Sequence, residues 1–295
     1  MINLMKFKIF YFVFSLLIII PGLYYLLTSG LKLGIDFTGG ALLEYRFEKE
    51  ISMEDVKEQI YSQGIDVGQI IKSSDNTYII RTKPLEQEKI IKLKSYLSEK
   101  FGNLEERRQE FVGPVVGSEL RQKTAIALIL ASFAIILYIA FSFRKVPRPQ
   151  SSLRFGIVAI VALLHDVLLV VGVFAILGKF LGVEVDILFI TALLTIIGFS
   201  VHDTIVVFDR IRENLIKNAG RKFIDVANLS VIQTLARSLN TSLTVVFVLV
   251  ALLLFGGETI RWFVVALLVG IISGTYSSIF NATALLVWWE ERLEH

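Results

Sequence analysis

Two ionisable residues at the edges of apolar stretches are the first candidates for chemistry in this 295-residue chain. Asp203 lies six residues before Asp209, where one apolar stretch ends, and Arg237 lies where the next one begins. Placing each such group in the hydrocarbon core of a membrane costs about 2.5–3.5 kcal/mol on insertion scales, so a functional or structural role has to offset that cost. Burial favours a protonated carboxyl group, and a nearby guanidinium favours the charged form. An aspartate that gains and loses an arginine partner can therefore bind and release a proton.

Other polar residues leave alternatives open. Asp203 can equally be a buried carboxylate that only fixes one helix to its neighbour, and polar residues that recur with Arg237 at helical spacing can be packing contacts. Asp166, in the His165-Asp166 pair, lies near the middle of its own apolar stretch. It can extend a proton path from Asp203 or accept hydrogen bonds in a buried network. His202 is expected to be a structural group, and small residues around Gly270 and Gly274 are expected to let helices approach closely.

The composition indicates a membrane protein. Hydrophobic residues make up 54% of the chain and charged residues only 19%, which leaves more apolar surface than one soluble core can bury. The net charge of +3 comes from basic residues beside apolar segments, so it indicates membrane topology and no nucleic-acid partner. Cysteine is absent, which excludes disulfides and thiolate sites. We expect neither a cofactor nor a metal site.

Six apolar segments are long enough to cross a bilayer whose core of about 30 Å needs roughly 20 helical residues. They are residues 9–27, 124–143, 155–177, 185–208, 239–255 and 262–289. The first segment is expected to be an uncleaved anchor, because no small-residue cleavage site follows Pro21-Gly22. The positive-inside rule places both termini in the cytoplasm, since Lys and Arg concentrate before the first segment and in alternate short loops.

This topology predicts four parts. Residues 1–27 form the first transmembrane helix, 28–123 an extracytoplasmic domain, 124–289 a five-helix transmembrane region and 290–295 a cytoplasmic tail. The tail ends in Leu293-Glu294-His295, which resembles the start of an affinity tag. Lipid is therefore expected around most of the chain.

The outer segment has the pattern of a small α+β domain. Alternating residues through Phe47 indicate a strand, and Ser52 and Asp55 have capping-box spacing ahead of a helix. Two strands at 67–72 and 77–82 flank an Asp75-Asn76 turn, and a second amphipathic helix and a strand at 108–112 follow. The order strand, helix, strand, strand, helix, strand predicts a ferredoxin-like domain.

Four passages resemble the SecF family of the Sec protein-export machinery. They are Gly34-Ile35-Asp36-Phe37-Thr38-Gly39-Gly40, Val112-Gly113-Pro114-Val115-Val116-Gly117-Ser118-Glu119-Leu120, the stretch from Ser200 through His202-Asp203-Thr204 to Asn214, and Gln233-Thr234-Leu235-Ala236-Arg237-Ser238. The resemblance covers almost the whole chain. It implies that the family's proton-pathway aspartate and arginine correspond to Asp203 and Arg237. Its signature aspartate corresponds to Asp36, where a role as a turn former is at least as good an explanation.

The resemblance implies a subunit of the bacterial cytoplasmic (inner) membrane that pairs with SecD and associates with the SecYEG channel. There it would use the proton-motive force to assist unfolded preproteins in transit, with H⁺ or Na⁺ as the coupling ion. One alternative is half of a small-molecule exporter of the resistance-nodulation-division type, which the small outer domain disfavours. Another is a scaffold subunit without ion transport. An enzyme is not expected, because neither a Ser-His pair nor an HExxH motif is present.

Overall fold

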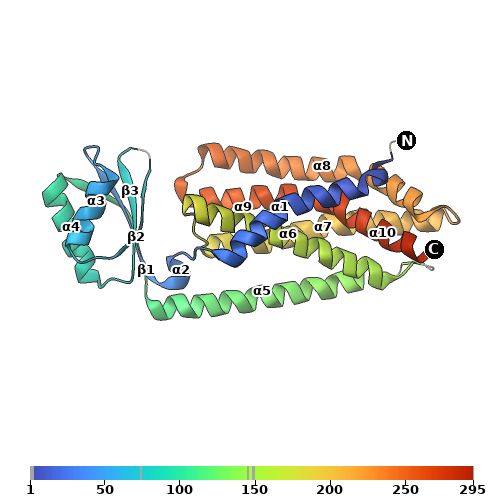
Figure 1. Ribbon diagram of the computed structural model, residues 1–295, viewed down its shortest axis with the longest axis horizontal. Coiled ribbons are helices and arrows are strands. Elements are labelled where there is room, and N and C mark those ends of the chain that lie inside the picture. The colour runs from blue at the N-terminus through green and yellow to red at the C-terminus, as the bar shows by residue number, and fades with distance from the viewer. Residues whose placement is uncertain (1–2, 74, 145, 148–149, 295) are drawn as a thin grey trace. The chain divides into compact units, whose positions relative to one another are not determined.

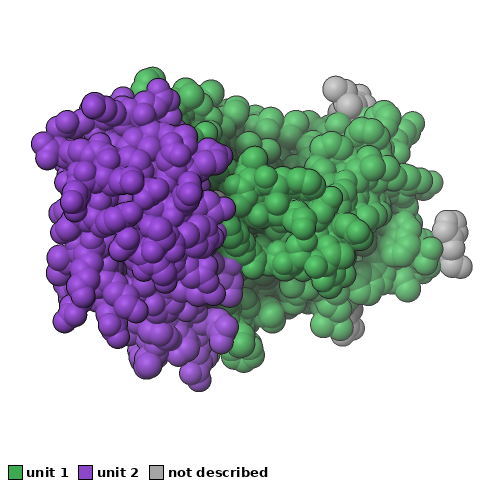
Figure 2. Space-filling view, turned by 60° about the vertical axis from the view of Figure 1, so that its left-hand side comes forward, with its two compact units in different colours: residues 1–32, 127–295 green, residues 33–126 purple. Residues whose placement is uncertain are grey.

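A computed structural model describes residues 3–73, 75–144, 146–147 and 150–294. Lys145 and Arg148, two basic residues of the loop between the second and third predicted spans, and His295 lie outside these ranges. The chain divides into two compact units: residues 1–32 with 127–295, and residues 33–126 (Figure 2). We call them the helical unit and the sheet unit.

The sheet unit has the predicted ferredoxin-like order. Its elements are β1 Gly40–Phe47, α3 Met53–Ser62, β2 Val67–Lys72, β3 Thr77–Thr82, α4 Gln87–Phe101 and β4 Leu104–Val112. The strands lie in the order β2-β3-β1-β4, and every neighbouring pair is antiparallel. β4 begins at Leu104, earlier than the predicted residue 108, because its strongly charged first half still pairs with β1.

One face of this sheet is covered by the two helices. Leu43, Tyr45 and Phe47 of β1 point toward them, since side chains alternate between the two faces of a strand. The helices contribute apolar residues at helical spacing, all of them buried: Val56, Ile60, Ile90, Leu93 and Leu97. The core of the sheet unit therefore lies between the helices and the sheet.

The predicted cap at the start of α3 is present. The Ser52 side chain accepts a hydrogen bond of 3.0 Å from the backbone N–H of Asp55. Replacing Ser52 by Ala leaves this N–H without its partner, so we expect the free energy of unfolding of the sheet unit to fall by about 1 kcal/mol. Thermal unfolding of the purified chain measures the change. Ser95→Ala, an exposed serine in the middle of α4, is the control and should change stability by a few tenths of a kcal/mol.

The two glycine motifs meet in the sheet unit. After the short helix α2 Ile35–Thr38, Gly39 and Gly40 have φ of +71° and +149°. A Cβ atom on Gly117, in the first turns of α5 Pro114–Ser142, would lie 2.8 Å from the Gly39 nitrogen. The Gly39-Gly40 pair thus lies directly against the start of α5, and only residues without side chains permit this approach.

Among the described residues, six helical segments are long and apolar enough to cross a membrane, as predicted. They are Leu4–Thr28 (η1 with α1 Lys8–Thr28), α5 Pro114–Ser142, α6 Ser152–Leu181, α7 Ile187–Lys217, α8 Phe223–Phe255 and Thr259–Leu293. The last contains most of α9 Glu258–Tyr276, the π-helix η2 Ser277–Ala282 and most of α10 Thr283–Glu294. Both chain ends and the α7–α8 connection lie at one end of the helical unit (Figure 1).

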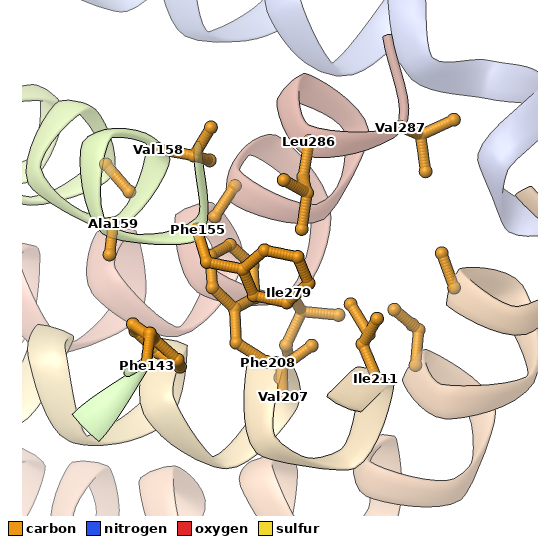
Figure 3. Packing of buried hydrophobic residues seen from close by; sticks show 14 of the residues in the cluster. Phe143, Phe155, Val158, Ala159, Val207, Phe208, Ile211, Ile279, Leu286 and Val287 are labelled. Atoms are coloured by element: carbon orange, nitrogen blue, oxygen red, sulfur yellow. The ribbon is translucent and has the colours of Figure 1, made fainter. Parts of the chain in front are cut away.

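α6, α7 and the last span form the centre of the helical unit. Half of the most apolar 18-residue window of α6 and of α7 is buried, and 61% of that of the last span, against 11% for α5. α1 crosses α6 closely, because a Cβ atom on Gly22 would lie 2.8 Å from the Gly172 Cα. α5 meets the bundle at its far end through Phe143, whose ring centroid lies 5.6 Å from that of Phe208 and 5.9 Å from that of Phe155 (Figure 3).

Three helix boundaries differ clearly from the prediction, and one of them is the end of α7 at Lys217, past the predicted residue 208. α8 begins at Phe223, well before residue 239, and α5 begins at Pro114, before residue 124. Hydropathy marks only the apolar part of a helix, whereas α8 continues for about 50 Å at 1.5 Å per residue. Arg237 consequently lies well inside a continuous helix.

Candidate functional site

Asp203 is buried in the centre of the helical unit, with 2% of its surface exposed. α7 directs its carboxylate toward α9, where the Thr275 hydroxyl donates a hydrogen bond of 3.3 Å to Oδ2. Thr275 in turn shares a hydrogen bond of 2.6 Å with Ser242 of α8. A short polar chain therefore joins Asp203 to two neighbouring helices.

Arg237 lies in the same layer as Asp203 but on the outside of the unit. Asp203 is about 24 Å from the Ile187 end of α7, and Arg237 about 27 Å from the Phe255 end of α8, at 1.5 Å per residue. Within the described part of the chain the two side chains form no ion pair, and Arg237 is exposed. Its neighbour Ser238 is the residue that α8 turns inward, with 2% exposed surface.

Asp166 is the most enclosed acidic residue of the site, with none of its surface exposed. Its Oδ2 accepts hydrogen bonds from the hydroxyls of Ser200, at 2.5 Å, and Ser277, at 2.7 Å. Its Oδ1 lies 2.9 Å from His165 Nδ1 and 3.4 Å from the Ser273 hydroxyl. Three helical elements thus converge on one carboxylate, which is the network that the sequence left open as one of two interpretations.

The π-helix η2 supplies part of this network. It places Ser277 toward Asp166, while Ser278 shares a hydrogen bond of 2.8 Å with Thr204 of α7. It also turns Asn281 inward, where its Nδ2 lies 2.5 Å from Ser15 Oγ of α1 and 3.2 Å from His165 Nε2. Single π-turns inside α-helices occur often at functional sites. Here the wider turn brings three polar side chains toward three different helices, α1, α6 and α7.

Sequence reasoning missed four residues of this site: Ser242, Ser273, Thr275 and Ser278. For Ser273, Thr275 and Ser278 the signal was a dense run of polar residues from Ser273 to Ser278 within an otherwise apolar segment. Small residues there were predicted to serve packing, and Gly270 and Gly274 do allow close approach. A Cβ atom on Gly274 would lie 3.3 Å from Ser200 Cβ and 3.5 Å from Asp166 Oδ2.

The hydroxyl of Ser277 is expected to stabilise the fold through Asp166. Replacing Ser277 by Ala removes one of the donors to a fully buried carboxylate, so the free energy of unfolding in bicelles should fall by about 1–2 kcal/mol. Steric trapping or a thermal shift assay measures the change. Ser142→Ala is the control, because that exposed hydroxyl bonds only to the Tyr138 carbonyl of its own helix. Equal stability of the two variants would show that the Ser277 bond contributes nothing.

Two protein-family models match the sequence. "Protein export membrane protein SecD/SecF, C-terminal" matches residues 92–292, and "SecD/SecF GG Motif" matches residues 24–51. A protein translocase subunit SecF from Thermobaculum terrenum is 52% identical, over 99% of this chain and 95% of the relative. The chain belongs to the SecF family. Its Gly39-Gly40 pair lies within the residues that match the second family.

Other SecF relatives occur as part of longer chains. The protein translocase subunit SecDF of Bacillus subtilis is 37% identical over 96% of this chain, which spans only 37% of that protein. The crystal structure of SecDF from Thermus thermophilus, titled a translocon-associated membrane protein, superposes with a TM-score of 0.87 at 33% identity. The superposition covers 99% of this chain but only 39% of the SecDF chain. The SecF fold seen here is thus one part of a larger SecDF polypeptide in those proteins.

Proposed function

We propose that the chain works with a SecD-type partner to convert the proton-motive force into assistance for unfolded preproteins that cross the bacterial cytoplasmic membrane through SecYEG. Asp203 carries this proposal: it is a carboxylate buried in an apolar helical unit of a protein-export family. The role is that of a non-enzymatic transport subunit. Asp203 and Arg237 form the proton pathway, and Asp166 extends it.

The proposed orientation places both termini in the cytoplasm and residues 28–123 outside. It is supported by the basic residues at the end of the helical unit that holds both termini: Lys6, Lys8, Arg144, Arg154, Arg212, Lys217, Arg221 and Lys222. Several of them pair with acidic residues there, as Arg154 does with Glu290 at 2.5 Å. The opposite end offers few basic residues in its short loops, among them Lys179 and Arg261. The positive-inside rule assigns the richer end to the cytoplasm.

The exposed position of Arg237 supports a partner in the membrane. A guanidinium that faces lipid would cost several kcal/mol, so another protein has to supply polar or acidic groups beside α8. α5 and α8 are also the least buried spans together with the first. SecDF relatives carry further chain beyond the part that matches SecF. A SecD-type chain against α8 would meet this need.

The proposed mechanism has two states of Asp203. With Arg237 close, the carboxylate is charged; with Arg237 withdrawn, it binds a proton. A membrane potential of about 100 mV contributes roughly 2.3 kcal/mol per charge moved, enough to bias a helix rearrangement more than tenfold. A shift of α7 would reach the end of α5 through Phe208 and Phe143, and the first turns of α5 belong to the sheet unit, where Gly117 lies against Gly39.

Vesicles that contain SecYEG, the SecD-type partner and this chain test the function. Preprotein translocation should rise when a proton gradient is imposed, with pH and sodium varied independently to identify the coupling ion. A sodium-only response would replace the proton in the mechanism. Translocation that ignores both gradients would leave a scaffold role, and gradient-driven efflux of small molecules without an effect on preprotein would favour the exporter.

A further inference from the structure

His165 has hydrogen-bond partners on both ring nitrogens although it lies in a membrane span. Nδ1 is 2.9 Å from Asp166 Oδ1, and Nε2 is 3.2 Å from the Asn281 side-chain nitrogen. Only 14% of its side chain is exposed. Imidazole is the side chain whose ordinary charge change falls near neutral pH, so a partly buried histidine with a carboxylate partner is a candidate proton-binding group.

The groups that contact or surround this pair come from α1, α7, α9 and η2. α7 contributes the Ser200 hydroxyl, and the last span contributes the Ser273 and Ser277 hydroxyls, all three of which donate to Asp166. α1 contributes Ser15, and the Tyr276 hydroxyl lies nearby and donates to the Tyr11 carbonyl. The other titratable groups that face this region are Tyr11, Tyr276 and Asp203, and Asp203 directs its carboxylate to Thr275.

The two polar atoms of the Asn281 amide differ in their hydrogen bonding. Its Nδ2 contacts both Ser15 and His165, whereas its Oδ1 is buried without a hydrogen-bond partner. A buried acceptor left unpaired costs about 1–3 kcal/mol. A half-turn of the amide exchanges the two atoms and brings Oδ1 to His165 Nε2. Ser15 can match either orientation, since a hydroxyl both donates and accepts.

The two amide orientations correspond to two protonation states of the ring. In the neutral ring Nδ1–H donates to Asp166, and Nε2 accepts from the Asn281 amide nitrogen. In the imidazolium both nitrogens donate, Nδ1–H to Asp166 and Nε2–H to Asn281 Oδ1. Proton uptake changes the His165–Asp166 pair from one net negative charge to none, which suits a buried site. Oδ1 then gains both contacts, and Nδ2 takes the position that offers no partner.

We propose that His165 is a second proton-binding site of the chain, with Asp166 as its fixed anion and the Asn281 amide as the group that adapts to either protonation state. This site deepens the proposed function, because it supplies a proton acceptor on α6, a helix that packs against the α7 of Asp203. Its binding of protons can nevertheless be measured without any export assay.

The test is solid-state NMR of ¹⁵N-histidine-labelled full-length chain, with its SecD-type partner, in lipid vesicles between about pH 8 and pH 5. The chain has three histidines, so single variants assign the signals. We expect the His165 ring to pass from one protonated nitrogen to two over this range. A ring that keeps one neutral tautomer throughout overturns the proposal.

Two variants and one control separate the parts of the site. Asp166→Asn and Asn281→Leu should each lose the doubly protonated His165 signal, the first by removing the anion and the second by removing the acceptor. Two variants are used because Asp166→Asn can also weaken folding. His202→Gln, an exposed histidine on α7, should remove its own signal and leave the titration of His165 unchanged. Normal titration in both Asp166→Asn and Asn281→Leu would contradict the assigned roles.

Export measurements on the same samples distinguish this site from the proposed function. If His165 titrates but export ignores the proton gradient, the proton-driven function fails and the site stands. If export follows the gradient while His165 remains in one neutral state, the site fails and the function stands.

Discussion

Replacing Asp203 by Asn is expected to leave the chain folded in the membrane and to abolish the gradient-dependent part of preprotein export. Asparagine has the same shape and can still accept the Thr275 hydrogen bond, but it cannot exchange a proton. A charge that crosses 100 mV contributes about 2.3 kcal/mol, so loss of this group removes a bias of up to about 50-fold. Export into vesicles with and without an imposed gradient measures the effect.

Arg237→Met should give the same loss, because an aspartate without its alternating partner would remain in one state. The controls are Asp209→Asn, an exposed carboxylate on the same helix paired with Arg212, and Arg221→Met, an exposed arginine in the α7–α8 connection. Both controls should export at the wild-type rate. Wild-type export by either Asp203→Asn or Arg237→Met would remove that residue from the mechanism.

The largest loss of stability is expected from a side chain at Gly40. This residue has φ of +149°, and a Cβ atom there would lie 2.4 Å from the Thr82 carbonyl oxygen of β3. Gly40→Ala therefore combines a backbone conformation that L-residues rarely adopt with a clash in the β1–β3 ladder. We expect unfolding of the sheet unit to become easier by roughly 3–5 kcal/mol.

Gly64→Ala is the matched control for this change. Gly64 also has a positive φ, +69°, but no atom lies within 4 Å of the position of a new Cβ. It should lose only about 1 kcal/mol, the cost of the left-handed conformation alone. Thermal unfolding or limited proteolysis of both variants measures the difference. Equal losses would mean that the contact between β1 and β3 relaxes freely.

The sheet unit was predictable because its residues follow simple periods. Leu43, Tyr45 and Phe47 alternate in β1, and Ile90, Leu93 and Leu97 repeat at helical spacing in α4, so each element identifies its own buried face. The six spans were predictable from hydropathy for a similar reason. The true start of α8 at Phe223 was not, because polar helix outside the hydrocarbon carries no hydropathy signal.

The sequence predicts how far along its helix each site residue lies, but not which way its side chain points. Residue counting from the helix ends places Asp203 and Arg237 in one layer, yet rotation about each helix axis decides which side chains meet. Arg237 and Ser238 are adjacent, and the structure turns Ser238 inward. The π-helix η2 could not be read from the sequence either, since its extra residue per turn depends on hydrogen bonds to α6 and α7. The pairing of Asp203 with Arg237 stays a prediction.

Proton exit from sealed vesicles during preprotein translocation tests the role of Asp203 most directly. Vesicles that contain SecYEG, the SecD-type partner and either wild-type chain or Asp203→Asn would enclose a pH-sensitive dye. Preprotein enters the lumen, so the protons that drive it move outward, and their exit would be recorded alongside translocated preprotein. We expect proton exit and translocation to rise together in the wild type and both to fall to the gradient-independent level in the variant. Undiminished proton exit coupled to translocation in Asp203→Asn vesicles would show that the proton takes another route.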